Sequence, residues 1–309
     1  MIFSQGKDFM KKILLDNALE SWSIAVKYCN NIKNGLCTLH YQKTFVSSLH
    51  NAIELLLKQI MLDNNDHSII DKMKVKNEDD AMLQLNYYKS TSLNEFFKSL
   101  SDDDRDKLRS IEFKDLIEKS TQLIKSALTK LNIVSIKEEL KKLQSLRNNE
   151  THFYISKADY LSEDDFVVLH NLMIIIFEVM QEYHLLPYWG KACDKYKQLE
   201  FNTTSINSFS YSSAVHSSPI AKSISNTLSG KQLFCYSDEP FDLTEQYFDE
   251  LNEANEQSSY TFNEILSIIT MMKHYEIISF ISEQVSDEAE LDTGEIIPPQ
   301  YEHIIDITL

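Results

Sequence analysis

Glycine and proline are scarce, with only five of each among the 309 residues of the chain. β-Sandwiches and Rossmann-type folds need many tight turns, and tight turns rely on these two residue types. The scarcity therefore argues against both folds. Apolar side chains are plentiful, since 43% of the residues are hydrophobic and 11% are aromatic. This length and composition predict a sizeable core in one large or two ordinary domains.

Membrane and redox signatures are also missing. The sequence has no run of about 18 apolar residues and no secretory apolar segment at its start, so we expect no membrane partner. The four cysteines, Cys29, Cys37, Cys193 and Cys235, are scattered and form no C-x-x-C pair. We expect them to be reduced, mostly buried thiols of a cytoplasmic protein.

Sequence patterns that hold metals or cofactors are absent as well. Neither H-x-H nor H-E-x-x-H occurs, and there is no glycine-rich loop of the kind that cradles phosphate. The remaining histidines lie far apart along the chain. We therefore expect neither a cofactor nor a metal site.

The net charge of -17 is distributed unevenly. Residues 231–309 hold 18 acidic and two basic side chains, whereas the first 230 residues hold 29 acidic and 28 basic ones. The most basic stretch is 105–158, with 12 basic and 7 acidic side chains. Segregated charge influences partner binding only where folding keeps it together in space, and the sequence leaves that point open.

Helical periodicity dominates the chain, because apolar residues recur every three or four positions between polar turns. It predicts helices at residues 7–33, 44–62, 79–88, 93–100, 113–131, 136–154, 166–186, 244–256 and 262–283, and a terminal strand at 301–309. The expected fold is mainly α. It has a helical bundle at 1–195, a Ser/Thr/Asn-rich linker or irregular segment at 196–230, and a smaller acidic α(+β) region at 231–309.

The stretch from Glu139 to Tyr154 carries the most informative pattern. Three leucines at helical spacing are followed by six polar residues, from Arg147 to His152, without one aliphatic side chain. On a helix, Asn148 and His152 lie one turn apart on the same face, and Arg147 reaches the same space. Such a run is either a solvated helix end or a site. As a site, these side chains can hold a phosphate and transfer a proton.

A polar stripe crosses the apolar helix predicted at 44–62. His50, Glu54 and Lys58 are spaced four residues apart and therefore share one face. One interpretation is a ladder of side chains that faces solvent. The other is a supporting layer behind the site, in which Glu54 orients Arg147. Lys58, and Glu150 within the polar run, are further candidates for this supporting role.

These residues carry a family resemblance. The run Arg147-Asn148-Asn149-Glu150-Thr151-His152 resembles the R-x(4–6)-H motif of HEPN-domain ribonucleases, in which a polar residue, often Asn, follows the Arg. Including Tyr154, the pattern R-x(4)-H-x-Y resembles HEPN toxins that are paired with a minimal nucleotidyltransferase antitoxin. The segment from His50 to Leu62 is similar to the second helix of that family. The resemblance covers roughly residues 17–187.

The resemblance implies a HEPN-like helical bundle that acts as a metal-independent endoribonuclease. Arg147, Asn148 and His152 would be catalytic, and two copies would face each other across a cleft in a homodimer. RNA would be the substrate, and an antitoxin or another defence-system protein would be a partner. The role would be that of a toxin or phage-defence effector, with Tyr154 as a modification site.

A different class of function stays open at this point. The alternative is a non-catalytic helical interaction module, whose acidic region 231–309 binds a basic protein partner. The polar run would then be an ordinary helix end, with basic groups beside the last carbonyls. Exposing RNA to the purified protein distinguishes the two functions.

Overall fold

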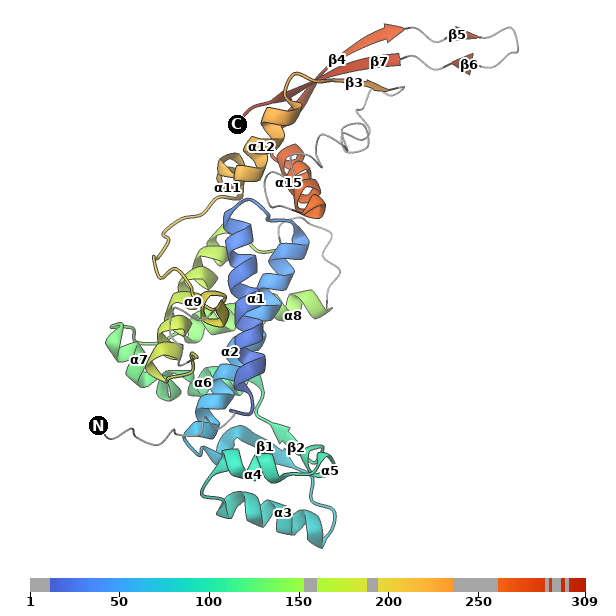
Figure 1. Cartoon of the computed structure of the whole chain (residues 1–309). Helices are drawn as coiled ribbons and strands as arrows, with labels where there is room; N and C mark the ends of the chain where they lie inside the picture. The colour runs from blue at the N-terminus through green and yellow to red at the C-terminus, as the bar shows by residue number, and fades with distance from the viewer. Residues whose placement is uncertain are drawn as a thin grey trace. The chain divides into compact units, whose positions relative to one another are not determined.

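The computed structural model describes residues 12–152, 160–187, 194–235, 261–286, 289–290, 296–297 and 300–309. These residues are mainly helical, as the periodicity predicts. The chain forms two compact units (Figure 1). Unit 1 comprises Met1–Cys29 and Lys43–Ser208, and unit 2 comprises Asn30–Gln42 and Phe209–Leu309. The division falls within the first two helices, α1 (Leu15–Lys33) and α2 (Leu39–Asp63).

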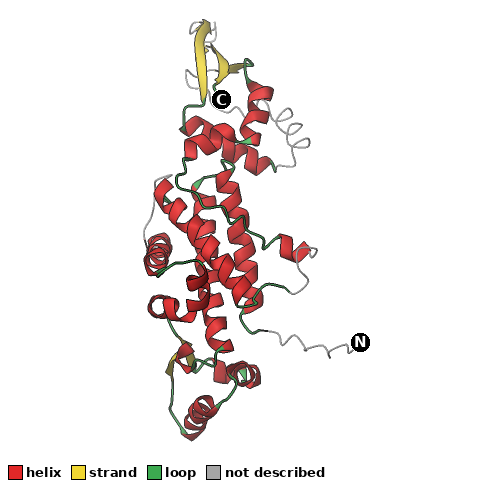
Figure 2. Ribbon diagram, turned by 90° about the vertical axis from the view of Figure 1, so that its left-hand side faces the viewer, coloured by secondary structure: helices red, strands yellow, loops and turns green. Residues whose placement is uncertain are grey.

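Unit 1 is a helical bundle. Besides α1 and α2 it contains α6 (Phe113–Leu123), α7 (Lys125–Lys130), α8 (Lys137–His152), α9 (Glu163–Glu182) and the short α10 (Asp194–Lys197). α8 packs against α6 and α9, and α7 packs against α9. Figure 2 shows how strongly helices predominate in the described residues. α9 is apolar around most of its circumference, and nine of its side chains are buried. Burial of this surface is the main source of the bundle's stability.

Trp22 is part of the apolar core of unit 1. Its side chain is fully buried, and its ring stacks on Phe177 of α9 with 6.4 Å between ring centroids. The indole Nε1 donates a hydrogen bond of 2.9 Å to the carbonyl of Leu199. This bond satisfies a buried donor, and it also ties the segment that follows α10 to α1.

A small lobe, residues 66–110, belongs to unit 1. It contains a 3₁₀ turn (His67–Ile69), β1 (Ile70–Met73), α3 (Glu78–Lys89), α4 (Leu93–Ser99), α5 (Asp102–Arg105) and β2 (Leu108–Ser110). β1 and β2 pair antiparallel, with Ile70 opposite Ser110. The helices predicted at 79–88 and 93–100 are confirmed. The two strands were not predicted, since runs of three or four residues carry little periodic signal.

Unit 2 combines helices with a small antiparallel sheet. Its helices are α11 (Tyr211–Ser217), α12 (Pro219–Leu228) and α15 (Phe262–His274), and its strands are β3 (Gln232–Cys235), β4 (Ile278–Ser286), β5 (Ala289–Glu290), β6 (Ile296–Ile297) and β7 (Gln300–Ile307). The sheet has the order β3–β7–β4, and α12 packs against α15. The predicted terminal strand is therefore confirmed as β7.

The segment 196–230, predicted to be a linker or an irregular stretch, is irregular at 200–210 but helical beyond it. It contains α11 and α12, and four apolar side chains of α12 are buried. Two of its many serines, Ser210 and Ser218, are helix N-caps whose hydroxyls accept hydrogen bonds from the first turn, and Pro219 occupies the first position of α12. The domain boundary accordingly lies at 208/209 rather than at 195, and residues 30–42 join unit 2.

The helix predicted at 262–283 is too long. α15 ends at His274, Glu276 adopts a left-handed conformation with φ of 56°, and β4 begins at Ile278. The sequence from Ile277 to Ile281 is rich in β-branched and aromatic side chains, which favour a strand that pairs with β7. The helix predicted at 244–256 lies outside the described residues.

Gly35 should be intolerant of any side chain. Its φ is +90°, and an added Cβ would lie 3.0 Å from the Cα of Val215 and 3.1 Å from the carbonyl of Ala214, which are backbone atoms. We expect Gly35→Ala to lower the free energy of unfolding by roughly 2–4 kcal/mol through strain and overlap. Denaturant melts of the whole chain measure this loss.

Gly230 supplies the matched control for Gly35. Its φ is +77°, but no atom lies within 4 Å of an added Cβ, so Gly230→Ala should cost only about 1 kcal/mol. Equal losses for the two variants would show that crowding at Gly35 contributes nothing.

Candidate functional site

The helix α8 is amphipathic up to Leu146 and polar from Arg147 to His152. Leu140 and Leu143 are fully buried and Leu146 is 5% exposed, which fixes the face that α8 presents to the bundle. Beyond Leu146, the side chains of Arg147 and Asn148 are exposed. The carbonyl of Leu146 also accepts a hydrogen bond from the buried hydroxyl of Tyr160. Packing therefore holds α8 up to the residue that precedes the polar run.

The helix continues without a break to His152. Asn148 and His152 thus lie on one face, one turn apart, as the spacing predicts. The side chains of Glu150 and His152 lie outside the described part of the chain, and so does the whole of Tyr154. The positions of these three side chains relative to Arg147 remain predictions.

The polar stripe of α2 lies mostly within the fold rather than in solvent. His50 and Lys58 are each 8% exposed. The Lys58 ammonium donates hydrogen bonds to Glu54 Oε1 at 2.6 Å and to Ser110 Oγ at 3.0 Å. Glu54 Oε2 lies 3.8 Å from His50 Nδ1. A solvent-facing ladder does not fit this burial.

The pKa of His50 reflects both its burial and the charges around it. The pKa of His50 is lowered from 6.5 to about 4, chiefly because the imidazole is buried. The Glu54 carboxylate opposes this shift, and the positive charges of Arg147 and Lys58 contribute to it. The Arg147 charge therefore acts on the buried stripe. The structure thus brings Arg147, at the exposed end of α8, into electrostatic range of the α2 stripe.

Two residues of this arrangement were not predicted. The Phe113 ring, at the start of α6, lies on the His50 imidazole with 4.1 Å between ring centroids. Ser110, the last residue of β2, accepts the second hydrogen bond from Lys58. Both are more than 50 positions from their partners in the sequence. Only the fold reveals them.

These groups have distinct chemical capacities. At neutral pH the low pKa of His50 keeps its imidazole uncharged, so His50 can orient neighbours by hydrogen bonding but cannot act as an acid. Arg147 offers an exposed, permanently charged guanidinium that matches a phosphate. The role of Glu54 in orienting Arg147 stays a prediction, since the contacts described above connect Glu54 to Lys58 and His50.

The basic excess of residues 105–158 is offset by carboxylates of unit 1. Lys142 pairs with Asp165 at 2.8 Å, and Lys137 pairs with Glu118 at 2.8 Å. Lys130 lies 3.4 Å from Glu178 on α9. Further pairs involve Arg105, Lys107, Arg109, Lys114 and Lys141. The basic stretch is therefore a network of local pairs rather than an open field of lysines, and this limits long-range attraction of RNA.

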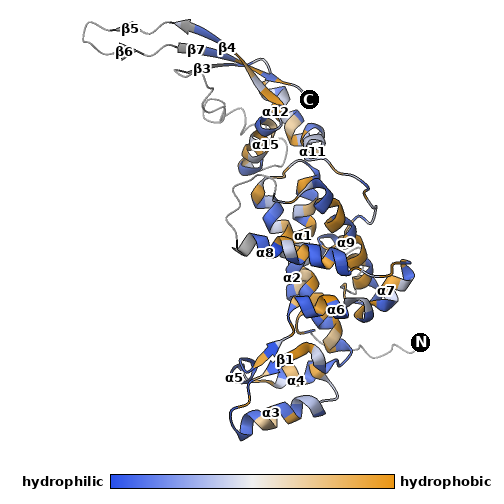
Figure 3. Cartoon of the chain, turned by 180° about the vertical axis from the view of Figure 1, so that it is seen from behind, coloured by the Kyte–Doolittle hydropathy of each residue, from blue (hydrophilic) through white to orange (hydrophobic). Residues whose placement is uncertain are grey.

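Two properties of the described residues bear on other functions. Those residues contain no group of three or more His, Cys, Asp or Glu side chains placed to hold a metal ion. Across the same part of the chain, every helix is too short or too polar to traverse a bilayer. Figure 3 shows that hydrophilic and hydrophobic residues alternate along these helices.

The chain has no match among known proteins in three comparisons. No protein-family model, no curated protein and no solved structure matches it.

The buried imidazole of His50 should make stability depend on pH. The unfolded chain binds a proton on His50 below about pH 6.5, whereas the folded chain binds it only near pH 4. Stability should therefore fall as the pH drops from 6.5 to 4, by up to about 3 kcal/mol. Urea melts across this range should show the fall in wild type and a smaller slope in His50→Gln.

His184→Asn is the matched control for this measurement, because it removes an exposed imidazole from the same unit at a left-handed position that Asn tolerates. It should leave the slope unchanged. An identical pH dependence in wild type and His50→Gln would show that His50 is not the titrating group.

Proposed function

We propose that the chain is a metal-independent endoribonuclease of HEPN type, with its active site at the C-terminal end of α8. The observation that carries the proposal is the exposed guanidinium of Arg147. It begins an R-N-x-x-x-H run on an unbroken helix, and its charge acts on a buried polar stripe of α2. A polar helix end without a role would not need ionisable groups buried behind it.

Arg147 would bind the scissile phosphate. Its planar guanidinium forms two parallel hydrogen bonds to phosphate oxygens and stays protonated while charge builds up on the phosphorane. Asn148, exposed next to it, would hold the phosphate or the reacting imidazole without itself titrating. This pair supplies binding and electrostatic stabilisation, and a proton-transfer group is still required.

His152 would transfer protons. In this reaction the RNA 2′-hydroxyl attacks its own phosphorus, so the enzyme supplies neither a nucleophile nor a water molecule. The products are a 2′,3′-cyclic phosphate and a 5′-hydroxyl. An imidazole with an ordinary pKa near 6.5 suits this task near neutral pH, whereas the buried His50, with a pKa of about 4, does not.

One histidine cannot readily serve as base and acid within a single turnover. A homodimer in which two Arg147/His152 sets face one cleft would supply both. Lys58 and Glu54 would support the site from α2, because the 3.0 Å hydrogen bond from Lys58 to Ser110 ties α2 to β2. The 2.6 Å hydrogen bond between Lys58 and Glu54 leaves neither charge buried alone. Glu150, which lies within the polar run, would share this supporting role.

A chain that cuts RNA needs control, and Tyr154 is the proposed point of control. A nucleotide attached to its hydroxyl would add bulk and negative charge where RNA phosphates enter. An antitoxin with nucleotidyltransferase activity, or another defence-system protein, would be the partner. The chain would then act as a toxin or phage-defence effector.

The second candidate function is a non-catalytic module that binds a basic partner through unit 2. One face of the β4–β7 ladder favours it. Ile281 and Ile304 are cross-strand partners that are 62% and 38% exposed, and Glu283 and Glu302 are paired directly beside them. Like charges placed opposite each other destabilise a sheet, and a basic partner would relieve that repulsion.

The catalytic pair is tested by single substitutions. Arg147→Ala and His152→Ala should each reduce RNA cleavage at least about a hundredfold, because the first removes phosphate stabilisation and the second removes proton transfer. Cleavage by wild type should persist in EDTA. Lys141→Ala is the matched control, since it removes an exposed cation from the same helix and should keep full activity.

Wild-type cleavage rates in either catalytic variant would rule out this site. RNA left intact by folded wild type over a wide range of concentrations would instead favour the binding module.

Regulation at Tyr154 is tested by removing its hydroxyl. Tyr154→Phe should keep ribonuclease activity, because a ring of nearly the same shape remains, and should resist inactivation when the gene next to its own is co-expressed. Intact-mass spectrometry of wild type from the same co-expression should detect an added nucleotide. Unmodified but inactivated wild type would show that control operates elsewhere.

A further inference from the structure

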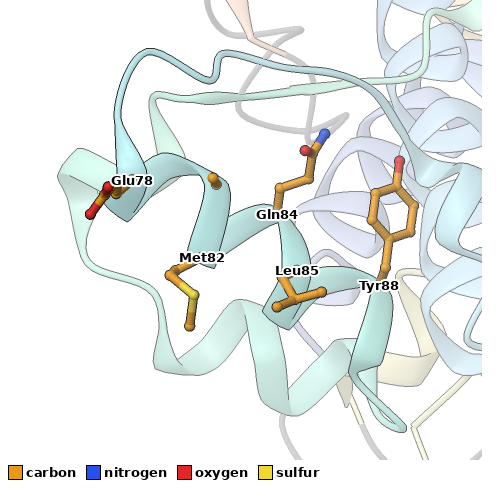
Figure 4. A pocket seen from close by; sticks show the side chains of 6 residues that line it. Glu78, Met82, Gln84, Leu85 and Tyr88 are labelled. Carbon is orange, nitrogen blue, oxygen red and sulfur yellow. The ribbon is translucent and has the colours of Figure 1, made fainter.

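The outward face of α3 carries an apolar stripe that the proposed ribonuclease does not use. Met82, Leu85 and Tyr88 are 55%, 42% and 63% exposed. Figure 4 shows Glu78, Met82, Leu85 and Tyr88 along this helix, lining a shallow hollow on its surface. Large apolar side chains scattered singly on a surface are ordinary, but three on one helix of twelve residues form a patch.

The opposite face of α3 packs against the rest of the lobe, so the apolar stripe has to face outward. Tyr87 is fully buried, its ring lies 5.4 Å from that of Phe96, and its hydroxyl donates to the carbonyl of His67. Asp80 is buried and accepts a salt bridge of 2.9 Å from Lys107, which lowers the pKa of its carboxyl. With this face committed to the lobe, α3 cannot roll to hide Met82 and Leu85.

Two residues of opposite charge stand at equal spacing on either side of Met82 and Leu85. Glu78, Met82, Leu85 and Lys89 are separated by four, three and four residues and therefore fall on one line along an α-helix. An acidic residue stands at one end and a basic residue at the other, with two apolar residues between them. Among the described residues, neither Glu78 nor Lys89 forms an ion pair within the chain.

Because of this spacing, the face is complementary to the same face of a second copy that runs in the opposite direction. In an antiparallel pair of α3 helices related by a two-fold axis, Glu78 faces Lys89 of the second copy, and Met82 faces Leu85 of the second copy. Each contact occurs twice, and Tyr88 flanks the seam beside Ala81 of the second copy. A parallel pair would instead bring Glu78 against Glu78 and Lys89 against Lys89.

We infer that the outward face of α3 is a self-association surface, and that its occupant is α3 of a second copy of this chain in antiparallel orientation. The charges of Glu78 and Lys89 favour a second copy of α3 in antiparallel orientation. Met82 and Leu85 provide the apolar area that this pairing buries. This surface is separate from the Arg147 site. It therefore joins single chains, or dimers formed at that site, in a separate association step, and it does not depend on ribonuclease activity.

The surface is small, so the association should depend on protein concentration. A helix of twelve residues is about 18 Å long, and a single pair of such helices lies at the low end of interface sizes. We expect a reversible step in mass over the micromolar range. High salt should weaken it, because the two Glu78–Lys89 contacts lie at the exposed ends of the stripe.

Charge exchange across the pair gives the test, read out by sedimentation velocity over a concentration series. Glu78→Lys alone sets Lys against Lys89, and Lys89→Glu alone sets Glu78 against Glu. Each single variant should associate about tenfold more weakly than wild type. The double variant should recover wild-type association, and so should an equimolar mixture of the two single variants.

Asp103→Lys, a charge reversal at an exposed position of α5, should behave as wild type. Met82→Asp should abolish the step, and its circular dichroism should match that of wild type, because the replaced side chain is exposed.

The inference is overturned if wild type shows no mass step, if the single variants associate as wild type does, or if neither the double variant nor the mixture recovers association. A dimer formed at the ribonuclease site shifts the starting mass of all variants equally and leaves this comparison intact. RNA cleavage by the same variants keeps the two proposals separate, since α3 variants should retain it.

Discussion

Burial of ionisable side chains on α2 is the constraint on which the architecture around the site depends. Removing Lys58 and Glu54 from water is costly unless each keeps a partner, and their 2.6 Å hydrogen bond provides one. His50 meets the same constraint differently, by remaining neutral with a pKa of about 4. A buried charged pair adds little stability over apolar side chains of similar size, so the stripe points to a role beyond stability.

This stripe connects parts of unit 1 that the sequence keeps far apart. Lys58 reaches Ser110 at the end of β2, and Ser110 pairs with Ile70 of β1, so the lobe of residues 66–110 is oriented by a contact to α2. His50 packs on Phe113 at the start of α6, and α6 supports α8. The exposed Arg147 and the outward face of α3 are thus both oriented through contacts that begin at the stripe.

Sequence reasoning succeeded where a single helix contains the whole pattern. The leucine spacing of α8 predicts its buried face, and the polar run predicts where that face ends, because both depend only on the pitch of one helix. It failed at 211–228, where serines that cap α11 and α12 resemble a flexible composition. It also failed at 278–283, where pairing with β7 makes a strand of residues that continue a helical pattern. The partners of the stripe, Ser110 and Phe113, depend on contacts between distant segments, which local periodicity does not encode.

The chemistry of the cut RNA ends tests the ribonuclease assignment most directly. We expect RNA treated with wild type in EDTA to carry 2′,3′-cyclic phosphates at the new 3′ ends and hydroxyls at the new 5′ ends, because attack by the 2′-hydroxyl leaves these groups. Mass spectrometry of the fragments from a short synthetic RNA identifies both ends. New 3′-hydroxyl ends paired with 5′-phosphates, or cleavage of an otherwise identical substrate with deoxyribose at the scissile position, would contradict an Arg147/His152 site of this kind.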